Sequence, residues 1–297
     1  MTKIIQNLSE VSASYDVLFC DLWGCLHNGS TPFPAAVRTL QDYRAAGGVV
    51  VLVTNSPRPS ASVRAQLADM HVPNDSYDLI ASSGDAAQYG LYSGAVGQKV
   101  YHLGPSHDVE FFNPISVDPT PLIPHNFIIE SVSFERAQGI VCTGLFDDTA
   151  DAPEDYREQF GKAIARDLPM LCANPDIIVD RGEQRIFCAG ALAQLYSEMG
   201  GRALYYGKPH APVYDLALRR LAALRPDLKE PRLLAIGDGI DTDILGAMSQ
   251  AIDSVFITSG IANGNFGPDP QNPNATLLNP WLTAHMRRAT FAIGYLR

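Results

Sequence analysis

The sequence has no long apolar run, no block of basic residues and no closely spaced pair of cysteines. No segment reaches the roughly 18 consecutive apolar residues that a membrane-spanning helix needs. The N-terminal stretch MTKIIQNLSEVSASYD also lacks the apolar core of a signal peptide. The five cysteines form no CxxC pair, so structural zinc is not expected. We therefore predict a cytoplasmic protein with no membrane partner.

Positive charge is scarce as well. The chain carries 22 Lys and Arg against 32 Asp and Glu, which gives a formal net charge of −10. A protein of this charge repels nucleic acid unless it has a local basic patch. The densest basic cluster is Arg287-Arg288, which we expect on a solvated helix face. No nucleic-acid partner is therefore predicted.

Short apolar runs alternate with amphipathic segments along most of the 297 residues. Several runs are continuous and rich in β-branched residues, as in parallel strands that are covered on both faces. This alternation predicts an α/β fold. The expected strands are 17–20, 49–54, 78–82, 99–104, 139–144, 169–174, 203–207, 232–238 and 254–260. The expected helices are 34–46, 59–70, 84–93, 152–167, 188–200, 211–224 and 241–250.

Two regions depart from this alternation. Residues 107–137 contain four prolines and little periodicity, which predicts irregular connections. Residues 261–280 are rich in Gly, Pro and Asn and are predicted to be a loop. Trp281 and the apolar residues after it are expected to dock a last helix.

Polar residues follow four of the expected strands. In an open parallel sheet the carboxyl ends of the strands meet at one crevice, so these residues are expected to lie together. Taken singly, each group is typical of a helix cap, a turn or a strand exit. Their order along the chain favours a functional site. The four groups are Asp21, then Thr54-Asn55-Ser56, then Gly207-Lys208-Pro209, and finally Asp238 with Asp241 and Asp243 close behind.

This set of side chains suits phosphoryl transfer. Asp21 can attack phosphorus and form an aspartyl-phosphate. Thr54 and neighbouring N–H groups can hold phosphate oxygens, and Lys208 can neutralise the developing charge. Asp21 and Asp238 offer the oxygen ligands that Mg²⁺ prefers. We therefore expect a magnesium-dependent enzyme that acts on a phosphorylated small molecule.

Four motifs and their order along the chain resemble those of the haloacid dehalogenase-like (HAD) superfamily. These motifs are DLWGCLHNG, TNSPRP, YGKPHAPVY and GDGIDTDILGA. The similarity is to subfamily IIA, the branch of NagD-type sugar phosphatases and 4-nitrophenylphosphatase-like proteins. CANPDIIVDRG and FCAGALAQLYSEMGG resemble the cap signatures of that branch. The resemblance covers nearly the whole chain. Its motifs are specific for fold and subfamily, and weak for substrate.

The resemblance implies a Rossmann-like parallel-sheet core with an inserted α/β cap. The core would comprise residues 1–92 and 205–297, and the cap residues 93–204. Relatives in this branch often form homodimers through the cap.

The resemblance also implies roles for individual residues. Asp21 would be the nucleophile and, with the Trp23 backbone carbonyl and Asp238, a metal ligand, and Asp243 would support the metal site from just outside. Residues at the phosphoryl group and the substrate would be Thr54, Asn55, Ser56 and Lys208, with Asn174, Pro175 and Asp176 on the cap.

Trp23 departs from the family pattern. Family phosphatases usually have a second Asp at this position, which protonates the leaving group and then activates water. The indole of Trp23 can do neither, and a positioned acid or base contributes about 10²–10⁴-fold to the rate. The backbone carbonyl is unaffected, so metal binding is expected to persist.

Three hypotheses follow from Trp23. In the first, the protein hydrolyses phosphomonoesters with weakened or rerouted acid and base chemistry. His27, Asp85, His210 or Asp241 would then replace the missing Asp, His27 being attractive because an imidazole titrates near neutral pH. A turn histidine with a structural hydrogen bond is the alternative for His27. In the second hypothesis, the protein binds a phosphorylated ligand with little or no turnover. In the third, it is a carbon–halogen hydrolase, in which halide leaves without a proton.

Two further side-chain roles are left open by the sequence. Trp23 is expected to stack on a substrate ring, to exclude water or to pack against the cap or core. Cys20 and Cys25 flank Asp21 and are expected to be small buried hydrophobic residues. Catalysis by either cysteine is the alternative.

Overall fold

The computed structural model describes residues 1–112, 128–181 and 184–297, and these residues form two compact units. The first unit comprises Met1–Thr54, Arg64–Ala81 and Ala217–Arg297. The second unit comprises Asn55–Val63 and Ser82–Leu216. The domain boundaries expected at residues 93 and 204 stay a prediction.

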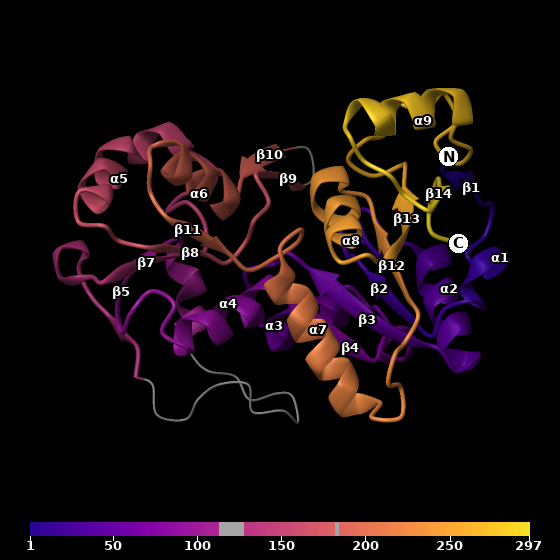
Figure 1. Ribbon diagram of the computed structural model, residues 1–297, viewed down its shortest axis with the longest axis horizontal. Helices are drawn as coiled ribbons and strands as arrows, with labels where there is room; N and C mark the ends of the chain where they lie inside the picture. Colours follow the sequence, from indigo (N-terminus) through magenta and orange to yellow (C-terminus); the bar gives the residue numbers. More distant parts are fainter. Residues whose placement is uncertain (113–127, 182–183) are drawn as a thin grey trace. The chain divides into compact units, whose positions relative to one another are not determined.

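The first unit is built on a seven-stranded sheet to which both ends of the chain contribute (Figure 1). The N-terminal strand β1 pairs in parallel with the C-terminal strand β14. Pairings from β1 through β3 are parallel, as predicted for an α/β fold. In sheet order the strands are β1 (Lys3–Ile4), β14 (Phe291–Ile293), β13 (Asp253–Ile257), β12 (Leu233–Gly237), β2 (Val17–Cys20), β3 (Val49–Thr54) and β4 (Leu79–Ser82).

Register places the ends of three neighbouring strands at one edge of this sheet. Ile236 of β12 pairs with Cys20 of β2, and Cys20 pairs with Leu52 of β3. Every residue of β2 and β3 is buried, which requires cover on both faces and explains their continuous apolar sequences. The residues that follow these strands are therefore neighbours at the carboxyl edge.

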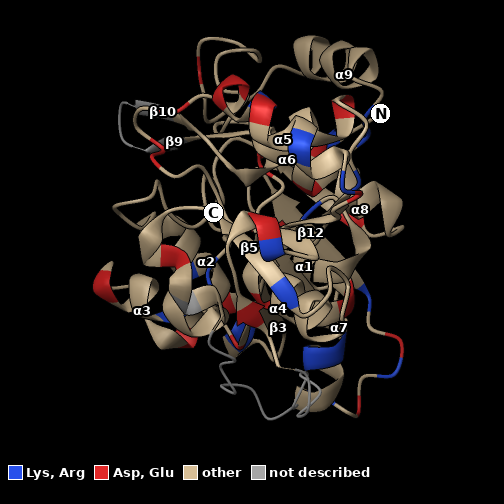
Figure 2. Cartoon of the chain, turned by 90° about the vertical axis from the view of Figure 1, so that its left-hand side faces the viewer, with Lys and Arg blue, Asp and Glu red and all other residues tan. Residues whose placement is uncertain are grey.

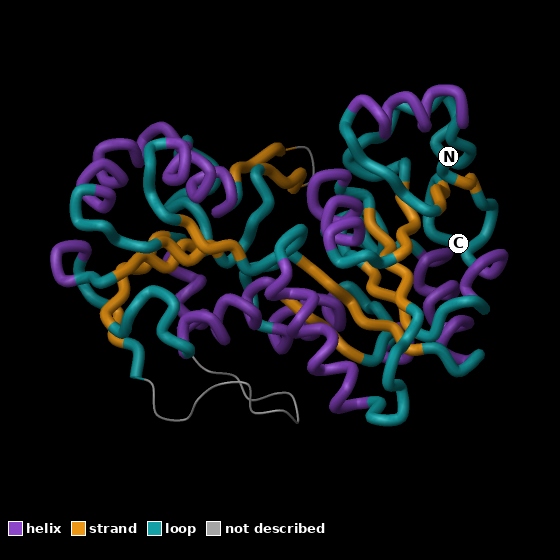
Figure 3. The backbone as a smooth tube through the Cα atoms, in the orientation of Figure 1, coloured by secondary structure: helices purple, strands orange, loops and turns teal. Residues whose placement is uncertain are grey.

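Helices alternate with the strands along the chain, as the tube in Figure 3 shows. Helix α2 (Pro34–Ala45) begins with a proline, whose fixed φ suits the first helical position. Its buried residues Ala36, Val37, Leu40 and Tyr43 follow the helical spacing of one apolar face. The other helical segments of the first unit include α1 (Ser9–Ser12), η1 (Asn74–Ser76), the single π-helical turn η5 (Ile240–Ile244), α8 (Leu245–Ser249) and α9 (Ala275–Ala284). Helices α3 (Ser60–Asp69) and α7 (Ala211–Leu224) each have residues in both units.

The second unit has its own five-stranded parallel sheet and a separate antiparallel pair of strands. In sheet order the five strands are β11 (Ala203–Tyr205), β8 (Met170–Cys172), β7 (Gly139–Cys142), β5 (Lys99–Leu103) and β6 (Glu130–Ser131). The antiparallel pair is β9 (Ile178–Arg181) with β10 (Gln184–Phe187). Its helical segments are α4 (Ser83–Tyr92), η2 (Ser106–Phe112), η3 (Phe134–Arg136), η4 (Pro153–Tyr156), α5 (Arg157–Ile164) and α6 (Ala189–Glu198).

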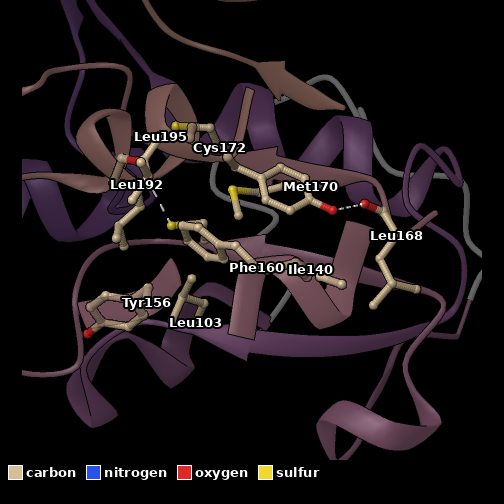
Figure 4. Packing of buried hydrophobic residues seen from close by; sticks show 14 of the residues in the cluster. Leu103, Ile140, Tyr156, Phe160, Leu168, Met170, Cys172, Leu192 and Leu195 are labelled. Carbon is tan, nitrogen blue, oxygen red and sulfur yellow. Dashed lines mark hydrogen bonds between the residues drawn. The ribbon is translucent and has the colours of Figure 1, made fainter. Parts of the chain in front are cut away.

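The main core of the second unit lies between its sheet and helices α5 and α6 (Figure 4). Met170 and Cys172 of β8 pack there with Phe160 of α5 and Tyr196 of α6. The rings of Phe160 and Tyr196 meet edge to face, with centroids 5.2 Å apart. The Tyr196 hydroxyl donates a hydrogen bond of 2.5 Å to the backbone carbonyl of Leu168. The only polar atom of this buried ring therefore has a partner.

Charged side chains of both signs are scattered along the chain (Figure 2). Several form surface pairs, for example Arg44 with Asp78 at 2.5 Å and Arg232 with Asp16 at 3.1 Å. Among the described residues, no helix combines the length and the apolar character needed to cross a bilayer.

Two expectations about elements were wrong. The strand before Lys208 was expected in the same sheet as Asp21, but β11 pairs with β8 in the sheet of the second unit. Short apolar strands of two parallel sheets read alike, so the sequence did not separate them. Helix α9 begins at Ala275, inside the predicted loop 261–280, and contains Trp281. Its Asn274 side chain caps the helix by accepting the Thr276 N–H at 2.9 Å.

Smaller elements also differ. Strand β14 and the β9–β10 pair were not predicted. Of the expected irregular region 107–137, residues 113–127 lie outside the described residues. The rest of that region holds all of η2 except Ser106, the short strand β6 and the 3-10 helix η3.

Phe160→Ala should lower the free energy of unfolding by about 3–5 kcal/mol, because it leaves a cavity in a core that is fully closed to water. Phe146→Ala is the matched control, since Phe146 in the same unit is 47% exposed. Urea unfolding of both variants checks this. Equal losses for the two variants would contradict the assignment of this core.

Candidate active site

Three predicted residues follow the three neighbouring strands of the first sheet. Asp238 comes directly after β12, Asp21 directly after β2, and Thr54 ends β3. All three side chains are buried, with Asp21 9% exposed and Asp238 4% exposed. Ligand oxygens of Asp21 and Asp238 lie within 4.8 Å of each other. The sheet thus places two carboxylates side by side, out of bulk water.

Asp238 is fixed by close approach of the backbone. Its Oδ2 accepts the Ile261 N–H at 2.9 Å. A Cβ built on Gly24 would lie 2.2 Å from this oxygen, and one built on Gly260 would lie 1.9 Å from it. Gly24 also has a φ of +73°, which a side chain disfavours. The glycine of the DLWG turn is therefore needed to seat the carboxylate.

Asp243 holds the loop that carries Asp238. Its Oδ2 accepts the Gly239 N–H at 3.0 Å, and a Cβ on Gly237 would lie 2.1 Å from the Asp243 Cβ. Asp243 lies in the π-helical turn η5, a type of distortion that is frequent at functional sites. This position suits the predicted supporting role, which stays a prediction.

The turn after Asp21 leaves the backbone carbonyl of Trp23 available. The Leu22 carbonyl accepts N–H groups from Cys25, Leu26 and His27, at 3.3, 2.8 and 3.0 Å. Gly24 N–H donates to the His27 carbonyl at 2.9 Å. Within residues 1–112, 128–181 and 184–297, no group donates a hydrogen bond to the Trp23 carbonyl. That carbonyl is thus free to act as the predicted ligand.

The Trp23 side chain packs within its own loop. A Cβ on Gly29 would lie 2.4 Å from the Trp23 Cη2, so the indole covers the bare backbone of this glycine. Its ring also meets the His27 ring edge to face, with centroids 5.7 Å apart. Of the roles considered for Trp23, packing is the one with observed contacts, and the contacts are local.

Cys25 joins the carboxylate pair, which the sequence did not predict. One ligand atom each from Asp21, Cys25 and Asp238 lies within 4.8 Å of the others. Cys25 is 1% exposed. Burial, and then the Asp238 and Asp21 carboxylates, raise the pKa of its thiol well above the ordinary value. The spacing Asp-x-x-x-Cys in DLWGC was a possible signal.

These groups fit a hard divalent cation. Asp21 and Asp238 supply two carboxylates, which are oxygen donors. The backbone carbonyl of Trp23 stays a predicted third ligand. Two buried carboxylates also repel each other, and a cation between them removes this cost. The Cys25 thiol is not a ligand that Mg²⁺ prefers.

In the second unit, Asn55, Lys208 and Asp176 form one hydrogen-bonded group. The Asn55 Oδ1 accepts the Lys208 N–H at 2.7 Å, and its Nδ2 donates to the Lys208 carbonyl at 3.0 Å. Nδ2 also donates to Asp176 Oδ1 at 2.8 Å. The Asn174 side chain in turn accepts the Asp176 N–H at 3.0 Å. The side chain of Asn55 therefore orients Lys208 and Asp176.

Ser56 lies next to this group. Its hydroxyl accepts the Arg58 N–H at 3.3 Å, and its carbonyl accepts the Gly84 N–H at 3.0 Å. Lys208 is 4% exposed, so its side chain lies out of bulk water. The ligand roles predicted for these residues stay predictions.

The reason for choosing His27 as a replacement acid or base was wrong. His27 is 1% exposed, and burial lowers its pKa from 6.5 to about 4. Its Nδ1 accepts the Gly29 N–H at 2.9 Å. The imidazole is therefore neutral at physiological pH and serves the turn, which is the structural alternative.

The other three candidates have structural partners. Asp85 Oδ1 accepts the Ser60 N–H at 3.1 Å, at the start of α3. Asp241 is exposed and pairs with Arg287 at 2.7 Å. The His210 ring stacks on Tyr205, with centroids 4.8 Å apart, and burial lowers its pKa. These contacts give each side chain a structural partner, and the predicted roles of all three as acid or base stay predictions.

Gly24→Ala should weaken Mg²⁺ binding by about 10–100-fold, as changes beside a metal ligand do, because the added methyl displaces Asp238. It should also destabilise the fold. Gly47→Ala is the control, since Gly47 has a φ of +95° but no atom within 4 Å of its Cβ position. Gly47→Ala should lower the free energy of unfolding by only about 1–2 kcal/mol, the cost of placing alanine in a left-handed backbone conformation. Calorimetric Mg²⁺ titration checks this, and unchanged affinity in Gly24→Ala would contradict it.

His27 should make the fold acid-sensitive. Its folded-state pKa of about 4 lies below the ordinary 6.5, so the unfolded chain binds the proton more tightly. The contribution of His27 is complete above pH 6.5 and is lost as the pH falls toward 4. Between pH 7.5 and pH 5, wild type should lose about 2 kcal/mol more than His27→Asn, which keeps an acceptor but does not titrate.

Urea unfolding at the two pH values measures this difference. His107→Asn, at an imidazole that is 64% exposed, is the control and should follow wild type. An identical loss in wild type and His27→Asn would show that His27 does not carry the acid sensitivity.

The family models and a solved structure that match this chain point to the same family. Residues 18–116 match a model described as haloacid dehalogenase-like hydrolase, and residues 205–278 match one described as HAD-hydrolase-like. A hydrolase of the haloacid dehalogenase-like family from Brucella suis 1330 has a solved structure with 36% identity and a TM-score of 0.83. That similarity covers 99% of this chain and 100% of the Brucella chain.

Two phosphatases are also similar. Ribonucleotide monophosphatase NagD of Escherichia coli is 21% identical, over 83% of this chain and 88% of NagD. A glycerol phosphate phosphatase from Mycobacterium tuberculosis was solved in complex with magnesium. It has 22% identity and a TM-score of 0.62, over 84% of this chain and 70% of that one. The chain spans 66% of the length of the first curated relative it matches. This chain belongs to the haloacid dehalogenase-like hydrolase family.

Proposed function

We propose that the protein is a magnesium-dependent phosphatase that hydrolyses a small phosphomonoester through an aspartyl-phosphate. The observation that carries this is the buried pair of carboxylates of Asp21 and Asp238, whose ligand oxygens lie within 4.8 Å of each other. Asp21, the Trp23 carbonyl and Asp238 would hold the ion, with Asp243 supporting Asp238. When bound, Mg²⁺ supplies positive charge that offsets the repulsion between carboxylate and phosphate.

In the first step, an Asp21 carboxylate oxygen forms a bond to phosphorus, and the bond from phosphorus to the leaving oxygen breaks. Lys208 donates hydrogen bonds to the phosphoryl oxygens and stabilises their charge. Thr54, Ser56 and the N–H groups near Asn55 complete phosphoryl binding. In the second step, water attacks phosphorus, the acyl–phosphate bond breaks, and Asp21 is restored.

Both steps need a proton transfer, and the side chain at position 23 cannot act as the acid or the base. A poor leaving group must then depart as an alkoxide or take its proton from water, and the attacking water has no base. The low pKa of His27 and its bond to Gly29 argue against rescue by that residue. Substrates with good leaving groups, such as aryl and acyl phosphates, should therefore react faster than sugar phosphates.

A second candidate function is binding of a phosphorylated ligand with little or no turnover. The packing of Trp23 on Gly29 and His27 favours it, because the indole contributes to the loop without adding an acid or base. A carbon–halogen hydrolase fits less well, since two carboxylates and a carbonyl form a metal site that this reaction does not need.

Substrate contacts beyond the phosphate are assigned to Asn174 and Asp176 of the second unit. The named relatives act on glycerol phosphate and on ribonucleotides, which supports a small phosphomonoester. A cytoplasmic location is supported by five free thiols. A homodimer formed through the predicted cap, residues 93–204, completes the proposal and rests on the resemblance to relatives.

Rapid mixing with 4-nitrophenyl phosphate and Mg²⁺ tests the proposed function. Wild type should release one equivalent of nitrophenol in a burst and phosphate slowly afterwards, because formation of the aspartyl-phosphate outpaces its hydrolysis. Trp23→Asp should accelerate the slow phase by about 10²–10⁴-fold. Asp21→Asn should abolish both phases.

Trp23→Phe is the matched control, because it also changes the packing on Gly29 but adds no acid. It should leave the slow phase unaccelerated. Fast steady turnover in wild type without a burst would show that another residue supplies the missing proton transfers. Ligand binding without product, unchanged in Trp23→Asp, would favour the binding protein.

A further inference from the structure

The Cys25 thiol lies at the carboxylate pair. Its sulfur belongs to the cluster in which one ligand atom each of Asp21, Cys25 and Asp238 lies within 4.8 Å of the others. Cys25 is 1% exposed, and its thiol makes no hydrogen bond across the part of the chain that the structure describes. The other thiol beside Asp21, that of Cys20, donates to the Asp21 carbonyl at 3.2 Å.

The backbone fixes where this thiol points. Cys25 directly follows Gly24, whose positive φ and contact with Asp238 leave little freedom for the turn. The Cys25 N–H is itself tied to the Leu22 carbonyl at 3.3 Å. The sulfur is therefore held at the cluster by the same turn that seats Asp238.

Two carboxylates and one sulfur form a mixed donor set. A hard ion such as Mg²⁺ uses the oxygens and ignores the sulfur. Zinc, and softer divalent ions such as cadmium, bind thiolate strongly and also accept carboxylate. A site with all three donors can therefore bind two classes of cation. Hard ions coordinate only the carboxylates, and thiophilic ions also coordinate the Cys25 sulfur.

The spacing allows such a complex with modest movement. With zinc bond lengths of about 2.0–2.3 Å, ligand atoms on one tetrahedral ion lie roughly 3.4–3.6 Å apart. The three atoms here, within 4.8 Å of one another, need to contract by at most about 1.4 Å. Asp238 is pinned by Ile261 N–H, so the contraction falls on Asp21 and Cys25.

We propose that Asp21, Cys25 and Asp238 form a site for a thiophilic divalent cation, Zn²⁺ or Cd²⁺, in competition with Mg²⁺. On binding, the Cys25 S–H bond breaks, its proton goes to solvent, and a sulfur–metal bond forms. A water molecule completes the coordination, as at open zinc sites. Such an ion takes the place of Mg²⁺ on the two carboxylates. The site itself requires only the three side chains, whether or not the protein is a phosphatase.

Titration of the metal-free full-length protein with Cd²⁺ tests this site, with the ultraviolet charge-transfer absorption of a cadmium–thiolate bond as readout. Wild type should show a band that saturates at one equivalent and recedes on addition of Mg²⁺. Cys25→Ser should weaken Cd²⁺ binding by at least the roughly 10–100-fold that even outer partners of a metal contribute, and should lack the band. Its Mg²⁺ affinity should stay unchanged, which shows that the carboxylate pair is intact.

Cys20→Ala is the matched control, because Cys20 is also buried beside Asp21 but lies outside the cluster. It should keep the band. Cys25→Ala serves as a second variant if serine disturbs the turn. Any of three results would overturn the proposal. They are absence of the band in wild type, persistence of the band in both Cys25 variants, or a band in wild type that Mg²⁺ does not reduce. The titration uses no substrate, so its result can be interpreted even if the protein shows no phosphatase activity.

Discussion

Electrostatic repulsion between Asp21 and Asp238 is the constraint on which the site depends. Two carboxylates at the ends of neighbouring parallel strands lie out of bulk water, where their mutual repulsion is strong. The fold holds them there with rigid backbone. Gly24 and Gly260 close around Asp238, Ile261 donates to it, and Asp243 ties down the loop that follows.

A cation that binds between the two carboxylates relieves their repulsion, which makes its binding more favourable. Parallel strand geometry alone brings the two acids together, and the apolar sequences of β2 and β3 keep those strands central. Any change that loosens Asp238 therefore affects the metal first. Changes confined to the core of the second unit act on stability.

Trp23 separates two functions that usually share one residue. The backbone at this position still offers a carbonyl with no hydrogen-bond donor from the described segments. The side chain instead covers Gly29 and contacts His27. The position therefore keeps a carbonyl that could bind the metal, whereas an indole can neither donate a proton to the leaving group nor activate water. This division agrees with the proposed enzyme, in which phosphoryl binding is kept and turnover is slow.

The parallel α/β fold was predictable because continuous apolar strands with polar ends carry a strong signal. The places of Asp21, Thr54 and Asp238 followed from strand order. Lys208 did not, since β11 reads like a core strand but pairs with β8. The start of helix α9 was placed too late because its Pro280 and Asn residues resemble a loop. The role of Cys25 was missed because burial beside two acids depends on the turn at Gly24.

The central claim is that Asp21 becomes phosphorylated and then persists in that form for want of a base. Acid quench of wild type after mixing with 4-nitrophenyl phosphate and Mg²⁺, followed by mass spectrometry of the peptide containing Asp21, tests it most directly. The account predicts that a phosphoryl group accumulates on Asp21 in wild type and decays quickly in Trp23→Asp. An unmodified Asp21 peptide during turnover, or a phosphoryl group on another residue, would contradict it.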